Sequence, residues 1–225
     1  MSAKELTNLL KGNDDQPTFN QARRSPEWPK WEKAIQSELA QLWEKGTWKL
    51  VEKPKDTKPI SNKWVLTKKQ DKEGNIVKYK ARLMACGFTQ HPGLDYDETF
   101  SLVICFKTIR ALLVMVPSKK LKVQQLDIKG AYLNGILTQP IYMKQPTSFN
   151  DGSRLVCLLV KSIYSLKQAR QVWNIKFDHT IQRHGFQQLI LDPCMYILRE
   201  GDQFIIVTIW VNNLLLFATT DKLIE

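Results

Sequence analysis

The sequence predicts a globular fold that mixes α-helices and β-strands, on three observations. Its 225 residues suit one full domain or two small ones, and 43% hydrophobic with 24% charged residues is ordinary for a globular chain. Apolar residues recur every fourth position from Trp31 to Trp43, which is typical of a helix. Residues 204–211 are rich in β-branched and aromatic side chains, which favours a strand. This composition excludes a disordered or fibrous chain.

The first half of the chain predicts a helix and a hairpin. Residues 1–24 are polar, and we expect them to be disordered. A Ser-Pro-Glu start signal at 25–27 and Gly46 then delimit the helix. Two strands, 60–69 and 76–85, follow with the turn sequence DKEGN between them.

The middle of the chain predicts two more helices with a strand between them. Apolar residues from Ile109 to Val116 lie on one side of a short helix, which should end before Pro117. Residues 121–127 suggest a strand. Residues 169–184 suggest a helix capped by Gly185, with Trp173, Phe177 and Ile181 in register.

The most apolar stretch, 204–218, predicts a hairpin. It is shorter than the roughly 20 residues of a membrane span and contains two adjacent Asn. We expect strands at 204–211 and 214–217, joined by Asn212 and Asn213 and buried on both faces. The charged N-terminus lacks the apolar core of a signal peptide, so we expect an intracellular location in cytoplasm or nucleus, with no membrane partner.

The formal net charge of +11 is concentrated in two stretches. Residues 49–82 carry 11 basic and 4 acidic side chains, and residues 116–176 carry 10 and 2. This makes nucleic acid a candidate partner, although a solvated surface can show similar clusters. The cysteines show no Cys-x-x-Cys spacing, which favours four free buried thiols over a zinc site or a disulfide framework. They are Cys86, Cys105, Cys157 and Cys194.

The second strand of the basic hairpin carries a candidate phosphate site. Lys78, Lys80 and Arg82 alternate with less polar residues, so three cations should project from one face of the strand. They could hold a nucleoside triphosphate or a template backbone. The same pattern is typical of an edge strand that uses charge to prevent aggregation.

A second candidate site begins where the strand at 121–127 ends. Asp127 stands among small residues in LDIKGAYLNG, where a carboxylate could reach a metal, and Tyr132 could form the wall of a sugar pocket. A lone Asp at a strand end is also a common turn residue or cap. Gln168, at the entry to a helix, indicates nothing by itself.

Taken together, the motifs resemble the reverse transcriptase domain of copia-type retrotransposons. They run in order from about Trp28 to the last residues: KWVLTKKQDKEGNIVKYKARLMACGFTQ, DYDETFS, QLDIKGAYLNG, IYMKQP, SIYSLKQARQVW and WVNNLL. The resemblance implies an α+β fold over 25–225, the fingers and palm of a right-hand polymerase with an antiparallel palm sheet packed on helices. It also implies that the chain is truncated after the catalytic hairpin, with the thumb and ribonuclease H domain absent.

The resemblance assigns roles to five residues. Asp127 matches the first metal-binding aspartate, and Tyr132 matches the aromatic gate that screens out a ribose 2′-hydroxyl. Lys80 and Arg82 lie in the fingers block that handles the incoming triphosphate, and the main phosphate contact could be either. Gln168 matches a polar residue near nucleotide and template. The implied cofactor is Mg²⁺, and the implied partners are a dNTP and an RNA or DNA template-primer.

The sequence departs from the family where its catalytic hairpin reads Tyr-Val-Asp-Asp, because Trp210, Val211, Asn212 and Asn213 stand there. An Asn offers Mg²⁺ a neutral carbonyl oxygen where the family has a carboxylate. Losing about 4 kcal/mol of transition-state stabilisation would slow the reaction roughly a thousandfold. Other departures are Ser165 for Gly, Leu102 for Pro, Cys86 for Lys, and Ala169-Arg170-Gln171 for Ala-Pro-Arg.

Three functions follow as alternatives. The chain could be an inactive reverse transcriptase-like domain, a pseudoenzyme derived from a transposable element. It could be a nucleic-acid-binding module that kept the basic fingers. It could also be a weak RNA-directed DNA polymerase within a longer polyprotein. The Asn pair favours the first.

Overall fold

The computed structural model describes residues 16–55, 57–91, 93, 95–96, 104–147 and 152–224. These residues form four α-helices, three short 3-10 helices and ten strands, so the fold is α+β with antiparallel sheets as expected. The chain divides into two compact units, each of which contains two separate segments. The first unit is Met1–Asp95 with Thr138–Leu166, and the second is Tyr96–Leu137 with Lys167–Glu225.

A short helix, α2 (Phe19–Arg24), forms at the end of the segment for which we expected disorder. Its start is a capping box: the Gln21 N–H donates to the Thr18 hydroxyl at 3.3 Å, and the Thr18 N–H donates to the Gln21 side chain at 2.8 Å. The expectation of disorder is therefore wrong for residues 19–24. The polar side chains of Thr18 and Gln21 form hydrogen bonds with backbone N–H groups at the start of the helix. Residues 1–15 lie outside the described part of the chain.

The helix α3 (Trp28–Glu44) confirms the predicted helix but corrects its buried face. Trp31 and Leu42 are fully buried, whereas Trp43 is 67% exposed. An α-helix turns by 100° per residue, so Leu42 lies about 20° from Trp31 around the axis and Trp43 about 120° away. Residues spaced by exactly four positions therefore drift around the helix, and after about two turns they no longer lie on the buried face.

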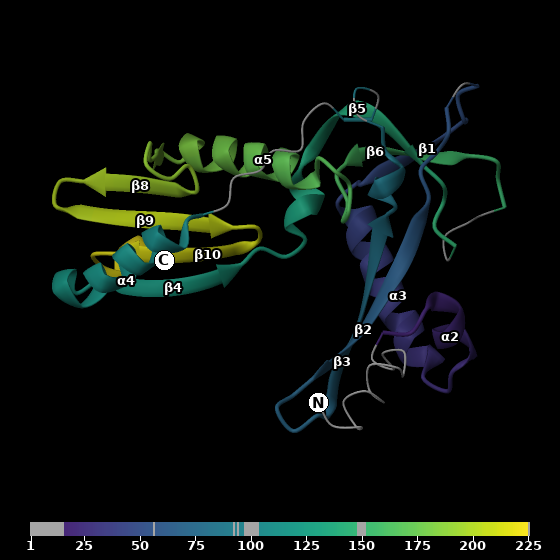
Figure 1. The fold of residues 1–225 in the computed structure, drawn as a ribbon, viewed down its shortest axis with the longest axis horizontal. Helices are drawn as coiled ribbons and strands as arrows, with labels where there is room; N and C mark the ends of the chain where they lie inside the picture. The colour runs from purple at the N-terminus through teal and green to yellow at the C-terminus, as the bar shows by residue number, and fades with distance from the viewer. Residues whose placement is uncertain are drawn as a thin grey trace, which may run out of the picture. The chain divides into compact units, whose positions relative to one another are not determined.

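The predicted hairpin is confirmed as β2 (Asn62–Gln70) and β3 (Ile76–Ala85), an antiparallel pair that forms its own two-stranded sheet. In its turn, the Asp71 carboxylate accepts from the backbone N–H groups of Glu73 at 3.1 Å and Asn75 at 2.7 Å. Helix α3 packs along β3 (Figure 1). Trp64, Leu66, Ala81 and Leu83 are the buried residues of this hairpin's middle section.

A three-stranded sheet that the sequence analysis did not predict completes the first unit. Its strands β1 (Trp48–Val51), β5 (Ile136–Met143) and β6 (Val156–Lys161) lie in the order β1-β6-β5. A 3-10 helix, η1 (Gly87–Thr89), follows β3. The backbone before β2 runs along β5, because the Ile60 N–H donates to the Tyr142 carbonyl at 2.8 Å and the Lys144 N–H donates to the Ile60 carbonyl at 2.9 Å.

The second unit is a five-stranded antiparallel sheet with two helices packed on it (Figure 1). The strand order is β4-β10-β9-β8-β7. The strands are β4 (Lys122–Asp127), β7 (Gln187–Gln188), β8 (Met195–Glu200), β9 (Gln203–Trp210) and β10 (Asn213–Ala218). Helices α4 (Phe106–Lys119) and α5 (Ala169–Arg183) share one core with this sheet, and the short helices η2 (Ala131–Asn134) and η3 (Asp221–Leu223) complete the unit.

Helix α5 confirms the predicted register, since Trp173, Phe177 and Ile181 are buried on one face. The end predicted for α4 is wrong, because the helix continues through Pro117 to Lys119. Pro117 costs one backbone hydrogen bond in the last turn, and the Leu121 N–H closes that turn by donating to the Val116 carbonyl at 2.9 Å.

Three of the four cysteines are buried free thiols as predicted, and Cys105 corrects the expectation because it is exposed. It precedes the first turn of α4 and faces no core. Burial raises the pKa of Cys157 to about 12. Within the described residues, no helix is long and apolar enough to cross a membrane.

Candidate functional site

The turn between β9 and β10 differs by one residue from the prediction. Its two turn residues are Val211 and Asn212, whereas Asn213 begins β10 and pairs with Trp210. The φ angle of Val211 is +60°, a region that a β-branched residue rarely occupies. The prediction placed both Asn in the turn because Asn tolerates this backbone region, but a two-residue loop in this register assigns the positive φ to Val211.

Two hydrogen bonds hold this strained turn. The Trp173 indole N–H of α5 donates to the Val211 carbonyl at 2.6 Å, and the Ile128 N–H donates to the Asn212 carbonyl at 2.8 Å. The sequence analysis identified Trp173 only as a core residue. A buried Trp N–H usually finds an acceptor, so Trp173 was a signal that a polar partner lies near this helix.

Asp127, Asn212 and Asn213 come together at this turn. Asp127 is the last residue of β4 and lies directly opposite Asn213 of β10. The Asn212 side-chain amide donates to the Asp127 carboxylate, and Gln125 donates to the Asn213 side-chain oxygen at 3.5 Å. The structure therefore places side by side the three residues that were predicted to share the catalytic position.

The chemistry of this group does not fit a magnesium centre. It offers one carboxylate, from Asp127, and two neutral amides, from Asn212 and Asn213. Among the described residues, no group of three or more His, Cys, Asp or Glu side chains could hold a metal ion. Hard Mg²⁺ prefers carboxylate oxygens, so these residues lack the charge for a two-metal site.

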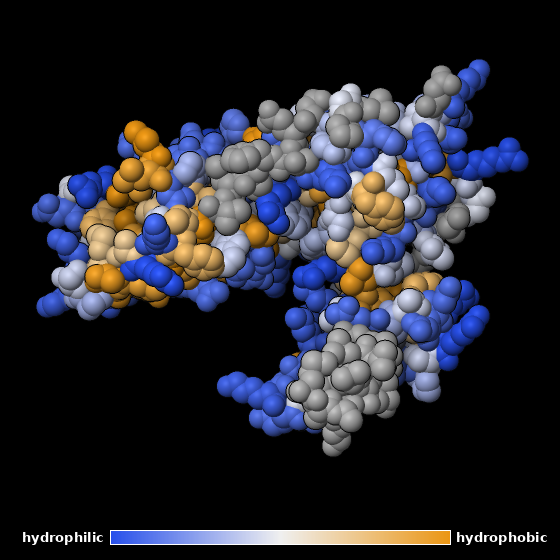
Figure 2. Space-filling view, viewed as in Figure 1, coloured by the Kyte–Doolittle hydropathy of each residue, from blue (hydrophilic) through white to orange (hydrophobic). Residues whose placement is uncertain are grey.

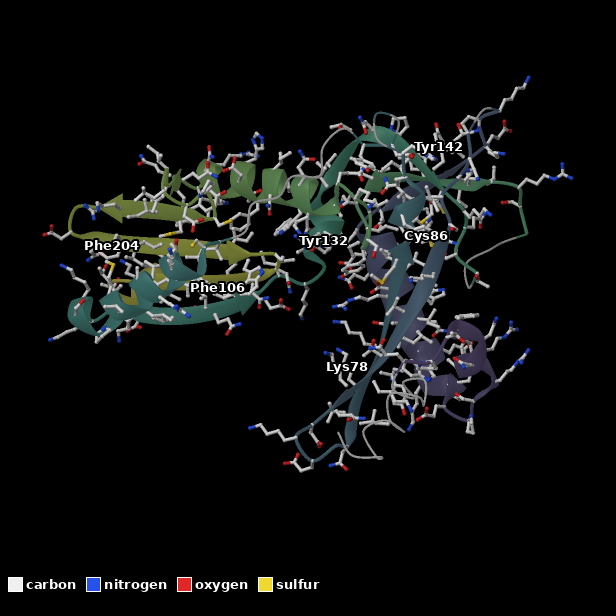
Figure 3. All side chains as sticks on the ribbon, in the orientation of Figure 1. Lys78, Cys86, Phe106, Tyr132, Tyr142 and Phe204 are labelled. Carbon is white, nitrogen blue, oxygen red and sulfur yellow. The ribbon has the colours of Figure 1, made fainter. Side chains whose placement is uncertain are left out.

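Tyr132 and Gln168 lie on two elements of the second unit that pack against each other. Tyr132 is a half-buried residue of η2, which follows Gly130 at a φ angle of +61° (Figure 3). Gln168 is the N-cap of α5 and is only 5% exposed. The helix α5, which begins after Gln168, packs against η2, which contains Tyr132.

The predicted basic row lies on β3 of the first unit, where Figure 3 marks Lys78. Lys78 lies directly opposite Lys69 of β2, which places two cations across the hairpin from each other. Burial lowers the pKa of Lys80, and the nearby positive charges of Arg82, Lys69 and Lys78 lower it further. The Arg82 guanidinium lies over the Tyr164 ring, 5.3 Å from its centroid.

An acidic residue of α3, Glu38, supports this row, and sequence reasoning missed it. Glu38 is buried beneath β3 and accepts from the Leu83 N–H at 3.4 Å. Burial raises the pKa of Glu38, while the attraction of Arg82 and Lys80 opposes that shift. Acidic residues with such roles give no signal in sequence, because Glu is equally common on exposed helix faces.

Glu27 at the start of α3 ties the helix to the hairpin. Its carboxylate pairs with Lys68 of β2 at 2.8 Å and accepts from the Tyr79 hydroxyl of β3 at 2.6 Å. These two hydrogen bonds, from Lys68 first and Tyr79 second, lower the pKa of Glu27 below its ordinary value. The sequence analysis used Glu27 only as a helix start signal.

The residues that depart from the family pattern lie in different structural environments. Ser165 adopts a φ angle of +68°, a backbone region that suits the Gly of the family. A Cβ on the nearby Gly87 would lie 2.0 Å from the Ser165 carbonyl oxygen, so only Gly fits there. Cys86 is buried, and Leu102 lies outside the described residues.

The chain is similar to known proteins of one family along nearly its whole length. Residues 45–225 match the family profile described as reverse transcriptase (RNA-dependent DNA polymerase). The chain is 39% identical over 220 residues to the retrovirus-related Pol polyprotein from transposon TNT 1-94 of Nicotiana tabacum. It is 36% identical over 219 residues to that from transposon RE2 of Arabidopsis thaliana.

A more distant match is the Ty1-DR4 Gag-Pol polyprotein of Saccharomyces cerevisiae, which is 27% identical over 212 residues. These alignments cover 96% of the chain for each of the two plant proteins and 91% for the yeast protein. The chain spans 17%, 15% and 12% of the length of these three relatives, in the same order.

Proposed function

Since the chain belongs to the reverse transcriptase (RNA-dependent DNA polymerase) family, we propose that it is a copia-type reverse transcriptase domain that has lost nucleotidyl transfer. In this proposal the replacement of two catalytic aspartates by Asn212 and Asn213 is the cause of the loss. The first unit, with its basic hairpin, corresponds to the fingers, and the second unit, with its five-stranded sheet on two helices, corresponds to the palm.

One observation carries the proposal: the single carboxylate of Asp127 lies beside Asn212 and directly opposite Asn213, two neutral amides. In a polymerase of this family, paired Mg²⁺ ions activate the primer hydroxyl and neutralise the leaving pyrophosphate. Here two of the three side chains bring no negative charge to hold such ions. We expect a loss of at least about 4 kcal/mol in transition-state stabilisation, or roughly a thousandfold in rate.

Primer extension on a short template-primer tests this proposal. The purified chain should extend no primer with either Mg²⁺ or Mn²⁺, while the Asn212→Asp, Asn213→Asp double variant should gain extension that is lost again on Asp127→Ala. Extension by the unaltered chain that Asp127→Ala abolishes would overturn the proposal. The unaltered chain would then be the weak polymerase of the sequence analysis.

A second candidate function, nucleic-acid binding by the basic row, has a specific observation in its favour. Lys69 and Lys78 are directly opposed across β2 and β3, and like charges in that position destabilise a hairpin. Figure 2 shows hydrophilic residues over the projecting end of this hairpin. A polyanion would relieve the repulsion among the cations, which supports phosphate binding over a role in solubility alone.

The Lys80→Ala, Arg82→Ala double variant tests this second function. We expect template-primer binding to weaken, and the slope of log affinity against log salt to fall by about 1.8 if each cation contacts one duplex phosphate. Fluorescence anisotropy with a labelled duplex measures both quantities. The variant Lys33→Ala, Lys49→Ala removes the same charge from exposed sites off the row and should bind like the unaltered chain. If the two double variants bound the template-primer duplex equally well, the basic row would not be its binding site.

A further inference from the structure

A pocket of about 260 Å³ lies beside helix α5 in the second unit. One wall is the N-terminal part of α5, and the other comes from β7, β8 and β9 with the segment that precedes β8. It shares no residue with the group around Asp127 or with the basic row. We refer to it as the α5 pocket.

Apolar groups form the body of the α5 pocket. Phe177 of α5 and Tyr196 of β8 are buried, and their rings meet edge to face with 5.6 Å between the centroids. Burial raises the pKa of Cys194 to about 11, so this part of the lining is a neutral thiol. A volume of about 260 Å³ lies just below the usual range of ligand pockets, so the pocket suits a ligand the size of one ring with a short chain.

Asp178 gives the α5 pocket a negative charge. Its Oδ1 atom accepts from the Tyr196 hydroxyl at 3.0 Å and from the Gln182 side-chain amide at 2.6 Å. Burial first, and the charge of Asp178 second, raise the pKa of Tyr196, so its hydroxyl stays protonated and holds the carboxylate in place. The Oδ2 atom of Asp178 accepts from no group in the described part of the chain.

A second acceptor of the α5 pocket also lacks a donor. The Gln188 side-chain nitrogen donates to the Pro193 carbonyl at 2.9 Å and to the Tyr196 hydroxyl at 3.3 Å. Its Oε1 atom accepts from none of the described residues. The described lining also contains no Lys, Arg or His. A ligand that satisfies both acceptors must therefore bring hydrogen-bond donors, and the charge of Asp178 favours a cation.

We propose that the α5 pocket binds a small arylalkyl amine in its ammonium form, with the charged nitrogen at Asp178 and Gln188. Its ring lies against Phe177 and Tyr196, because aromatic side chains favour offset or edge-to-face contacts with other rings. An ammonium group has three donors and no acceptor, so it matches two acceptors that lack donors. A guanidinium is disfavoured, because its planar fork needs both carboxylate oxygens and Oδ1 already accepts twice. This inference goes beyond the proposed function and stands without it.

Binding of phenethylamine at neutral pH, followed by two-dimensional NMR of the ¹⁵N-labelled full chain, tests the proposal. We expect saturable shifts of backbone N–H signals in α5, β7 and β8. The Asp178→Asn variant should bind phenethylamine about tenfold more weakly, because it loses a charged hydrogen bond. The matched control Asp202→Asn makes the same change at an exposed turn residue between β8 and β9, and it should bind like the unaltered chain.

A neutral ligand separates charge from packing without any substitution. Phenethyl alcohol has the same ring without the charge, and it should bind the unaltered chain about tenfold more weakly than phenethylamine. Equal binding of the two ligands, or no saturable shifts with phenethylamine, would overturn the proposal even if Asp178→Asn failed to fold. Equal losses of affinity in Asp178→Asn and Asp202→Asn would show a general charge effect and would also overturn it.

The side chain of a lysine could bring the same ammonium group on a protein. The amide of Nα-acetyl-lysine represents this source, and it should bind more weakly than phenethylamine because it has no ring to contact the aromatic walls. Tighter binding of the lysine derivative than of phenethylamine would show that the assignment to a free amine is wrong.

Discussion

Two residues with unusual backbone angles lie within the motifs SIYSLKQARQVW and WVNNLL. Val211 and Ser165 both have a positive φ, which costs a non-glycine residue of order 1–3 kcal/mol. Ser165 stands where the family has Gly, so a change of residue explains its strain. The strain at Val211 persists because Trp173 and Ile128 hold both carbonyls of the turn.

Removing the Trp173 donor should destabilise the second unit. Trp173→Phe leaves the Val211 carbonyl without its partner, and we expect a loss of about 1–2 kcal/mol in the free energy of unfolding beyond the packing loss. The matched control is Trp31→Phe, because the Trp31 indole N–H is buried and has no partner among the described residues. Chemical denaturation of both variants measures the difference. An equal loss in the free energy of unfolding for Trp173→Phe and Trp31→Phe would mean that the hydrogen bond from Trp173 to Val211 does not stabilise the fold.

At the scale of elements, Glu27 joins α3 to both strands of the basic hairpin. Its lowered pKa means that the folded state favours the charged carboxylate. The stabilisation is therefore complete above the ordinary pKa of 4.5 and is lost as the pH falls through the lowered value. The side chain of Glu27 is 32% exposed, so solvent screens part of this interaction.

The variant Glu27→Gln tests this joint between helix and hairpin. We expect Glu27→Gln to lower the free energy of unfolding by about 1 kcal/mol at neutral pH. The difference in free energy of unfolding between this variant and the unaltered chain should shrink as the pH falls below the ordinary pKa of 4.5. Thermal melts across pH measure this. The exposed Glu44 of the same helix provides the control, since Glu44→Gln should change little at any pH. A difference that is constant with pH would contradict the role of charge.

How far the sequence predicts these elements depends on the range of the interactions involved. The β2–β3 hairpin and α5 could be predicted because turn residues and a helical apolar period are local signals. Strand β1 could not, because its partner β6 is distant in sequence. Similarly, Asp127 and Asn212 were identifiable by motif, but the hydrogen bond between them depends on the register of β4 with β10.

At the scale of the whole molecule, the net positive charge is divided unevenly along the chain. The basic stretch 49–82 belongs entirely to the first unit, where it supplies the basic row. Restoring aspartate at 212 and 213 would lower the net charge from +11 to +9, so the lost carboxylates account for a small part of the surplus. Nucleic-acid binding and loss of catalysis are therefore compatible in one chain.

Binding of Mn²⁺, followed by electron paramagnetic resonance, tests the central claim most directly, because it examines the metal site without requiring polymerisation. We expect no tight Mn²⁺ binding by the unaltered chain. We expect binding by the Asn212→Asp, Asn213→Asp variant, and loss of that binding when Asp127→Asn is added. Tight Mn²⁺ binding by the unaltered chain that disappears on Asp127→Asn would contradict the account.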